Sequence, residues 1–189
     1  MRNIITTIAL AITMLYTGQA QNNNEINGNW VSGSTERNSY AYVDGKTIEG
    51  GSFDVDLTLI TEFDGEGLIY FRIDGAATYE HDTSTNDRNF VNVNIIVDNG
   101  SKKEYHGWIT DDGYVTIKRL EEGPNLFDLI DEMEKGNTVY IQTKGSGAAK
   151  VFKFDLNGFT KSVKRAFDLY YAQKSDNPFE KSNDNPFKG

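Results

Sequence analysis

Cysteine is absent from this sequence, and its absence excludes several kinds of protein at once. A chain without cysteine forms no disulfide, offers no thiolate to a metal ion, and has no cysteine to which a lipid could be attached. Histidine occurs only 2 times and proline only 3 times in 189 residues. The fold must therefore be held together by an apolar core alone.

Basic residues are also few, with 19 Lys and Arg against 28 Asp and Glu, for a net charge of -9. The acids are spread along the chain, which favours solubility, and no basic stripe is large enough to replace the counterions of a nucleic acid. We therefore expect no nucleic-acid partner. One local basic cluster is interpreted as the solvated face of a helix, with a binding patch as the alternative; it consists of Lys161, Lys164, Arg165 and Lys174.

Residues 1–20 have the three parts of a secretory signal peptide. Arg2 gives a positive start, Ile4 to Tyr16 form an apolar run interrupted only by threonines, and Gly18-Gln19-Ala20 is a small-x-small cleavage site. An uncleaved anchor is the alternative, but a run of about 13 residues is shorter than the ~20 that a membrane span needs. We predict cleavage after Ala20 and a periplasmic or secreted protein without stable membrane insertion. Loss of Arg2 would change the net charge from -9 to -10.

The mature chain divides by composition into three parts. Residues 21–28 are rich in asparagine and lack periodicity, so we expect a flexible lead-in. Residues 29–173 carry regular apolar patterns and have the length of one domain with a substantial core, so we expect a single domain there. Residues 174–189 are polar and are expected to form a disordered tail.

Short runs of alternating apolar and polar residues indicate strands that are buried on one side. Residues 53–73 read as a β-hairpin, because two such runs flank a glycine-rich turn. Residues 91–118 contain three more runs separated by turns and predict an antiparallel meander. In the first strand of the hairpin we expect Phe53, Val55, Leu57 and Leu59 to point inward, and Asp54, Asp56 and Thr58 to point outward.

Two segments have helical periodicity. Residues 126–133 are apolar at spacings of 3 and 4, and Gly136 ends the pattern. Residues 151–156 form a strand that turns at Asn157-Gly158 into an amphipathic helix from Phe159 to about Ala172. We predict a mainly β fold, an antiparallel β-sandwich with a short helix before the last strands and a C-terminal amphipathic helix. A partly open barrel is the alternative.

The order of these features resembles a known group of exported proteins. The chain has an early tryptophan strand at Trp30, an apolar-apolar-Arg strand at Leu68 to Arg72, a meander, a short helix before a late strand, and the closing motif Phe154-Asp155-Leu156-Asn157-Gly158-Phe159. This order resembles small exported β-sandwich proteins of the type VI secretion-associated periplasmic and invasion-associated locus B group. The resemblance implies the fold and an exported location, and it brings no catalytic residues. The chain departs from the group where cysteines are common, because Ile73 follows Arg72 and the final helix has none.

No set of residues has the spacing of a known catalytic or metal-binding motif. His81 and His106 lack a third ligand at metal spacing and are interpreted as structural. Ser32 and Ser34 lack the strand-to-helix turn that exposes a nucleophile. We therefore assign no catalytic, cofactor-binding or metal-binding residue, and we expect no cofactor.

Acidic residues are numerous enough to need separate consideration. Asp54 and Asp56 have the spacing that opens a calcium loop, but Thr58 and Leu59 follow where a third ligand and the turn glycine should stand. The acidic turns elsewhere also lack a full ligand set, and ordinary turn chemistry explains them. A pair of carboxylates that the fold brings together, as in glycoside hydrolases, stays open at this stage.

Aromatic residues on the expected strands offer a different kind of site. One face of the sheet could present them as a platform for sugars or peptides, although core packing is the favoured interpretation for most of them. These residues are Tyr40, Tyr42, Tyr70, Tyr79, Tyr105, Trp108 and Tyr114.

The tail contains the only repeat in the chain. The tetrapeptide Asp-Asn-Pro-Phe occurs at residues 176–179 and again at residues 184–187. Asn-Pro initiates a turn that can present the next phenylalanine, and two tethered copies can increase overall affinity through avidity. The motif resembles the Asn-Pro-Phe ligands of eukaryotic endocytic adaptor domains, whereas a passive disordered end is the alternative. The candidate interaction residues are Asn177, Pro178, Phe179, Asn185, Pro186 and Phe187.

The signal peptide, the missing catalytic motif and the resemblance together predict an exported, non-catalytic protein. It would act by binding, or as an accessory of a cell-surface or secretion assembly, and a protein is the expected partner. Two alternatives stay open. One is a secreted hydrolase acting on glycans or peptides, and the other is a host-directed protein that interacts through its tail.

Overall fold

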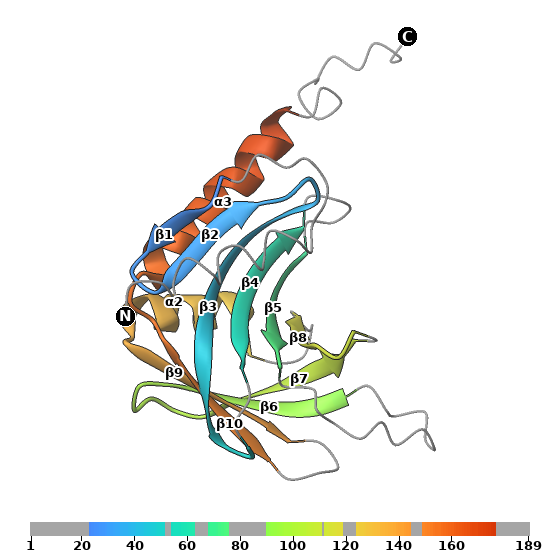
Figure 1. The fold of residues 1–189 in the computed structure, drawn as a ribbon, viewed down its shortest axis with the longest axis vertical. Helices are drawn as coiled ribbons and strands as arrows, with labels where there is room; N and C mark the ends of the chain where they lie inside the picture. The colour runs from blue at the N-terminus through green and yellow to red at the C-terminus, as the bar shows by residue number, and fades with distance from the viewer. Residues whose placement is uncertain are drawn as a thin grey trace.

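The computed structural model describes residues 23–51, 54–62, 68–75, 90–110, 112–118, 124–144 and 149–176. Strands dominate, and two helices lie late in the chain (Figure 1). The elements are β1 (Glu25–Asn27), β2 (Trp30–Ser34), β3 (Asn38–Glu49), β4 (Asp56–Glu62), β5 (Ile69–Asp74), β6 (Phe90–Val97), β7 (Lys103–Ile109), β8 (Val115–Lys118), α2 (Leu126–Lys135), β9 (Thr138–Lys144), β10 (Lys150–Asp155) and α3 (Phe159–Asp176).

The described strands form one antiparallel sheet that closes on itself. Eight of them follow the order β3-β10-β9-β6-β7-β8-β5-β4, and β4 pairs back with β3. The remaining two, β1 and β2, extend the sheet from β3. The mainly β, antiparallel prediction is confirmed, with its short helix and its C-terminal helix. The prediction of a sandwich is wrong, because the sheet closes into a barrel. Apolar and polar residues alternate along the strands of both architectures, so the sequence pattern does not decide between them.

Barrel closure depends on a change of partner along β3. Its first part, from Asn38 to Asp44, pairs with β4, and its last part, from Gly45 to Glu49, pairs with β10. A Cβ atom on Gly45 would lie 2.2 Å from the ring of Phe154. Glycine is therefore required where β3 changes partner and presses against β10.

The barrel interior is the hydrophobic core, and the expected alternation is confirmed there. Val55, Leu57 and Leu59 are buried, as predicted for the inward side of the first hairpin. The hairpin itself exists as β4 and β5, and β6, β7 and β8 form the predicted meander. Phe53 lies outside the described residues.

Both helices contribute their apolar sides to this core. Helix α2 buries Leu129 and Met133, and Lys103 of β7 forms a 2.7 Å ion pair with Glu132 on its outer side. Asn125 caps its first turn by accepting a hydrogen bond from the Phe127 N–H. Helix α3 packs against β2 and β3, behind them in the view of Figure 1. It runs to Asp176, four residues beyond the predicted end, and among the described helices none has the length and apolar character to cross a membrane.

The start of the ordered structure also differs from expectation. Strand β1 lies within residues 21–28, where we expected a flexible lead-in. It is held by antiparallel pairing with β2 and by Arg165 of α3, whose Nη1 lies 3.0 Å from Glu25. The sequence pattern of three residues is too short to show either interaction. The division into a signal peptide, one domain and a tail stays a prediction.

Candidate ligand-binding face

Residues on the outer side of β3, β4, β5, β8 and β7 form rows that run across the strands. Residues paired directly across antiparallel strands share one face, and every second residue along a strand does the same. One row joins Tyr40, Ile60 and Tyr70. The next joins Tyr42, Thr58, Arg72, Thr116 and Trp108, and the last joins Asp44, Asp56 and Asp74.

The tyrosines expected on strands are divided between this outer surface and the core. Tyr40 and Tyr42 are half-buried on the outer side, with ring centroids 6.2 Å apart. Tyr70 and Tyr114 are half-buried on the same side. Tyr105, in contrast, is 6% exposed and belongs to the core. Core packing, the favoured interpretation of the aromatic residues, is therefore wrong for these four outer tyrosines.

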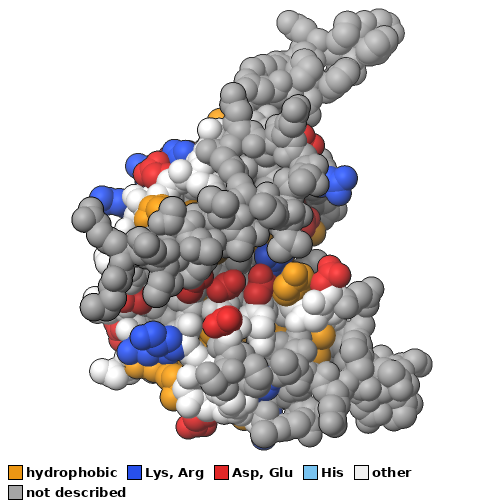
Figure 2. Space-filling view, viewed as in Figure 1, with side chains coloured by type: hydrophobic (Ala, Val, Ile, Leu, Met, Phe, Trp, Pro, Cys, Tyr) orange, Lys and Arg blue, Asp and Glu red, His pale blue; other side chains and the backbone are white. Residues whose placement is uncertain are grey.

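Three carboxylates face one another at the end of this surface. Asp44 lies opposite Asp56, and Asp56 lies opposite Asp74. The pKa of Asp56 is raised to about 7, first by burial, then by the charge of Asp44 and a hydrogen bond with it, and finally by the charges of Asp74 and Asp54. Asp56 consequently holds its proton up to near-neutral pH. Figure 2 shows acidic side chains gathered across the middle of this face, over β3 to β5.

Arg72 is the basic member of the surface. Its Nε lies 2.9 Å from Asp74, and its guanidinium carbon lies 4.6 Å from the centroid of the Tyr114 ring. Burial raises the pKa of Asp74 despite the opposing charge and hydrogen bond of Arg72. Burial, followed by Asp44, Tyr40 and Asp56, raises the pKa of Tyr42 to about 12, so its hydroxyl is a hydrogen-bond donor at neutral pH. We call this surface, made of Tyr40, Tyr42, Asp44, Asp56, Tyr70, Arg72, Asp74 and Tyr114, the tyrosine–aspartate face.

Local sequence explains why the carboxylates meet where they do. Asp44 is the last residue of β3 that pairs with β4, immediately before Gly45. Asp74 ends β5 and is followed by Gly75, which has φ +75° and whose Cβ would lie 2.1 Å from the Asp54 carbonyl oxygen. Two glycines therefore allow the backbones to converge beside the acidic row.

The residues first considered for catalysis do not join this surface. His106 is exposed on β7, and His81 lies outside the described residues. Ser32 is completely buried within β2 rather than at a strand-to-helix turn, and Ser34 ends the same strand. Asp56 belongs to the tyrosine–aspartate face, and the exposed Asp54 acts on it through its charge. Within the described part of the chain no group of His, Cys, Asp and Glu has the arrangement of a metal site.

The tail residues lie outside the part of the chain that the structure describes. Asn177, Pro178, Phe179, Asn185, Pro186 and Phe187 all follow the end of α3. Their role in interaction stays a prediction.

The predicted basic cluster lies on α3 and shares no residue with the tyrosine–aspartate face. Lys161, Lys164 and Arg165 line an open hollow of ≈ 410 Å³ together with Glu25, Asn27, Asp168 and Leu169. Arg165 is half-buried and bonded to the N-terminal segment rather than free in solvent. For this residue the interpretation as a solvated helix face is wrong, because β1 covers it.

Comparison with known proteins gives a structural likeness and no likeness in sequence. No protein-family model matches the chain, and no curated protein matches it. The crystal structure of invasion-associated protein B from Bartonella henselae is similar, with a TM-score of 0.52 and 13% sequence identity over 78% of this chain and 98% of that chain. The likeness is one of fold. It confirms, at that level, the resemblance anticipated from Trp30 and the motif at residues 154–159.

The row of Asp44, Asp56 and Asp74 could have been predicted from the sequence only in part. The alternation in residues 53–59 correctly places Asp56 on the outer side of its strand. The hairpin register then brings Asp74 opposite Asp56, but that register depends on the length of the turn between β4 and β5. Asp44 comes from a strand outside this hairpin, and no local pattern indicates that it lies beside Asp56.

Proposed function

We propose that this protein is an exported, non-catalytic binding protein, an accessory of a cell-surface or secretion assembly, and that it contacts its ligand through the tyrosine–aspartate face. The observation that carries the proposal is the row of Asp44, Asp56 and Asp74, placed directly opposite one another on neighbouring strands. Like charges opposed in this way reduce stability. Packing alone gives no reason for such a row, and perturbed carboxyl groups are concentrated at functional sites.

The chemistry of the face favours a cationic ligand. Carboxylates pair with ammonium and guanidinium groups, and tyrosine rings attract cations through the face of the ring. Arg72 already lies over Tyr114 in this manner, so the chain itself shows how a guanidinium fits. The net charge of -9 would also attract a cationic partner over a distance. A Lys- or Arg-rich segment of a protein is the ligand class that these groups fit best.

A hydrolase is the second candidate, and the Asp44–Asp56 pair is the observation that favours it. Two adjacent carboxyl groups, one of them with a raised pKa, can act as general acid and general base on a peptide bond. Their hydrogen bond brings them closer than the separations used in glycoside hydrolysis, which are about 5 Å or more. The open hollow at residues 161–169 lies on α3 and gives this pair no cleft.

Binding of a fluorescent oligolysine peptide to the purified protein tests the proposal. Fluorescence anisotropy should show saturable binding that weakens with salt. We expect Asp74→Asn and Tyr42→Ala each to weaken it about tenfold, the effect of losing one charge-assisted contact. Asp131→Asn, an exposed acid on α2, is the matched control and should bind like the parent.

Two results would count against the proposal. If Asp131→Asn weakened binding as much as Asp74→Asn, the attraction would come from net charge and not from this face. If incubation with peptide produced cleavage that Asp56→Asn abolished, the hydrolase would replace the binding protein.

A further inference from the structure

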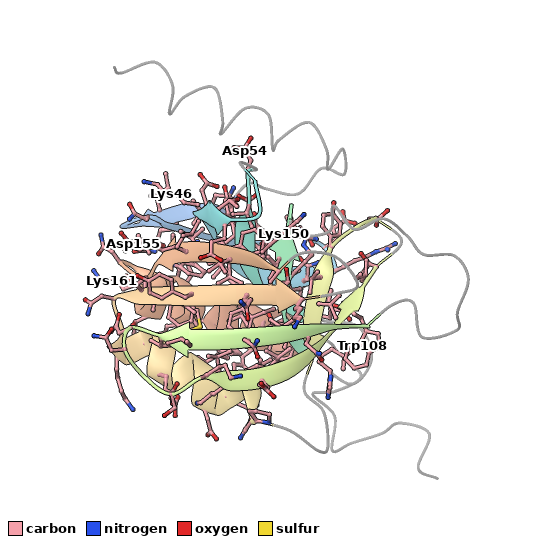
Figure 3. The ribbon with its side chains drawn as sticks, turned by 90° about the horizontal axis from the view of Figure 1, so that it is seen from below. Lys46, Asp54, Trp108, Lys150, Asp155 and Lys161 are labelled. Carbon is pink, nitrogen blue, oxygen red and sulfur yellow. The ribbon has the colours of Figure 1, made fainter. Side chains whose placement is uncertain are left out.

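The open hollow between β1 and α3 is a second, separate feature of the surface. It has a volume of ≈ 410 Å³ and is lined by seven residues from the two elements. Figure 3 shows Lys161 extending from the edge of the molecule. The lining residues are Glu25, Asn27, Lys161, Lys164, Arg165, Asp168 and Leu169.

Positive charge is concentrated on the α3 side of the hollow. Lys161, Lys164 and Arg165 lie at spacings of 3 and 4, so neighbouring cations repel one another on the same side of the helix. The first turn of α3 contains no acid, and cations near a helix N-terminus oppose the helix dipole. The arrangement is therefore unfavourable unless negative charge compensates it.

The acids present compensate only part of this charge. Glu25 pairs with Arg165 at 3.0 Å, which leaves Lys161, Lys164 and Asp168. Among the described residues neither lysine forms an ion pair. The lining thus carries a net charge of +1, three bases minus two acids, on a chain whose overall charge is -9.

Two residues of the same lining each carry a buried hydrogen-bond donor without an acceptor. Arg165 donates from Nη2 to the Asn23 carbonyl oxygen at 2.8 Å, but its Nε is buried without an acceptor in the described structure. The side-chain nitrogen of Asn27 is buried without an acceptor as well. Buried donors are normally paired, so two of them beside one hollow indicate a missing acceptor.

The backbone holds Asn27 firmly in this position. Gly28 has φ +61° and Gly158 has φ +96°, and the two turns that contain them are packed together. A Cβ on Gly158 would lie 1.7 Å from the Asn27 carbonyl oxygen, and the Asn29 N–H donates to the Asn157 carbonyl oxygen at 3.0 Å. The donor side of the hollow is therefore fixed to the start of α3.

We propose that this hollow binds a compact tetrahedral oxyanion, a phosphate or sulfate group. Lys161 and Lys164 supply the charge that attracts it, and the Asn27 amide and the Arg165 Nε–H donate hydrogen bonds to its oxygens after a small movement of either side chain. Such a group offers several charged acceptor oxygens, which matches a lining in which unpaired donors and positive charge are in excess. The site is independent of the tyrosine–aspartate face.

NMR titration of the purified protein with inorganic phosphate, at constant ionic strength against chloride, tests the site. We expect saturable shifts of the Asn27 side-chain amide and the Arg165 Nε–H signals. The variant Lys161→Gln/Lys164→Gln should lower phosphate affinity at least about tenfold. Lys46→Gln/Lys144→Gln removes two exposed lysines from β3 and β9 and should leave the affinity unchanged.

Other outcomes would overturn the proposal. Equal weakening in the two double variants would show general charge attraction, and shifts that never saturate, or that leave Asn27 and Arg165 unmoved, would show that the hollow holds no anion. Because both variants retain every core residue, their melting temperatures report whether either has lost the fold.

The source of the anion is decided by a second probe. Flotation with phosphatidylcholine vesicles, with and without phosphatidic acid, distinguishes a lipid headgroup from a soluble phosphate. Retention on phosphatidic acid vesicles that is lost in Lys161→Gln/Lys164→Gln assigns the site to a headgroup. Phosphate binding without vesicle retention assigns it to a soluble ligand.

Discussion

The rings of Trp30 and Phe159 meet edge-on, with their centroids 4.8 Å apart and their planes at 69°. The Trp30 Nε1–H also donates to the Asp155 carbonyl oxygen at 2.8 Å. Both side chains are almost completely buried. An early strand is thereby joined to the last strand by a hydrogen bond and to the last helix by an aromatic contact.

Removal of the Phe159 ring should destabilise the protein strongly. We expect Phe159→Ala to lower the free energy of unfolding by about 3 to 5 kcal/mol, because a fully buried aromatic ring leaves a cavity and Trp30 loses its partner. Tyr171→Ala, on the same helix but 64% exposed, is the matched control and should change it by less than about 0.5 kcal/mol. Urea unfolding followed by tryptophan fluorescence measures both. Equal midpoints would contradict the role of the contact.

Two phenylalanines of the closing segment should differ in their contribution to stability. Phe154 is completely buried in the barrel, whereas Phe167 packs against the core from a partly exposed position on α3. We expect Phe154→Ala to lower the free energy of unfolding by about 3 to 5 kcal/mol and Phe167→Ala to lower it by about 1 to 2 kcal/mol, in proportion to the apolar area lost. Thermal melts compare them, and a larger effect of Phe167→Ala would show that α3 is packed differently.

Gly158 should resist substitution by alanine. The left-handed backbone at φ +96° alone costs a non-glycine residue about 1 to 3 kcal/mol, and the added Cβ would collide with the Asn27 carbonyl oxygen. Gly100→Ala is the milder comparison, because its Cβ would lie 3.0 Å from the nearest atom. Chemical denaturation should give a much lower free energy of unfolding for Gly158→Ala than for Gly100→Ala. The reverse order would mean that the two turns are not packed together.

Asp56 should make stability depend on pH. Its pKa in the folded protein, about 7, lies above its ordinary value of 3.8, so the folded state binds this proton more tightly than the unfolded state. The free energy of unfolding must therefore fall as pH rises from about 4 to about 7, and the loss persists above pH 7.

Asp56→Asn removes this titration and isolates its effect from that of the other acids. At pH 7.5 we expect the variant to be about 1 to 2 kcal/mol more stable than the parent, since one pKa unit corresponds to about 1.4 kcal/mol and solvent at this half-buried site screens part of the shift. At pH 4 the difference should vanish. Denaturation across this range measures it, with Asp131→Asn as the exposed control; parallel curves for all three proteins would show that Asp56 titrates normally.

The tail makes a prediction that does not depend on the barrel. If the repeated Asp-Asn-Pro-Phe motif recognises a partner, changing both Phe179 and Phe187 to Ala should remove specific proteins from a pull-down made with the native exported fraction. Changing Lys181 and Lys188 to Ala in the same tail is the control and should leave those proteins bound. Identical partner sets for all the baits would assign the tail a passive role.

The sequence by itself determined the local elements of this protein. The alternation around Val55 and Leu57 predicted an antiparallel strand with Asp56 outside, and Gly136 predicted the end of α2. Such patterns work because a strand repeats every two residues and a helix every 3.6, whatever lies around them. They also fix which side of each element is buried.

Only the tertiary structure decided which strands are neighbours. The pairing of β3 with both β4 and β10 turned the expected sandwich into a barrel, and it placed Asp44 beside Asp56. The same closure brought Asn27 to the start of α3. Contacts between distant segments depend on how all the elements pack at once, and a period along the chain carries no information about that arrangement.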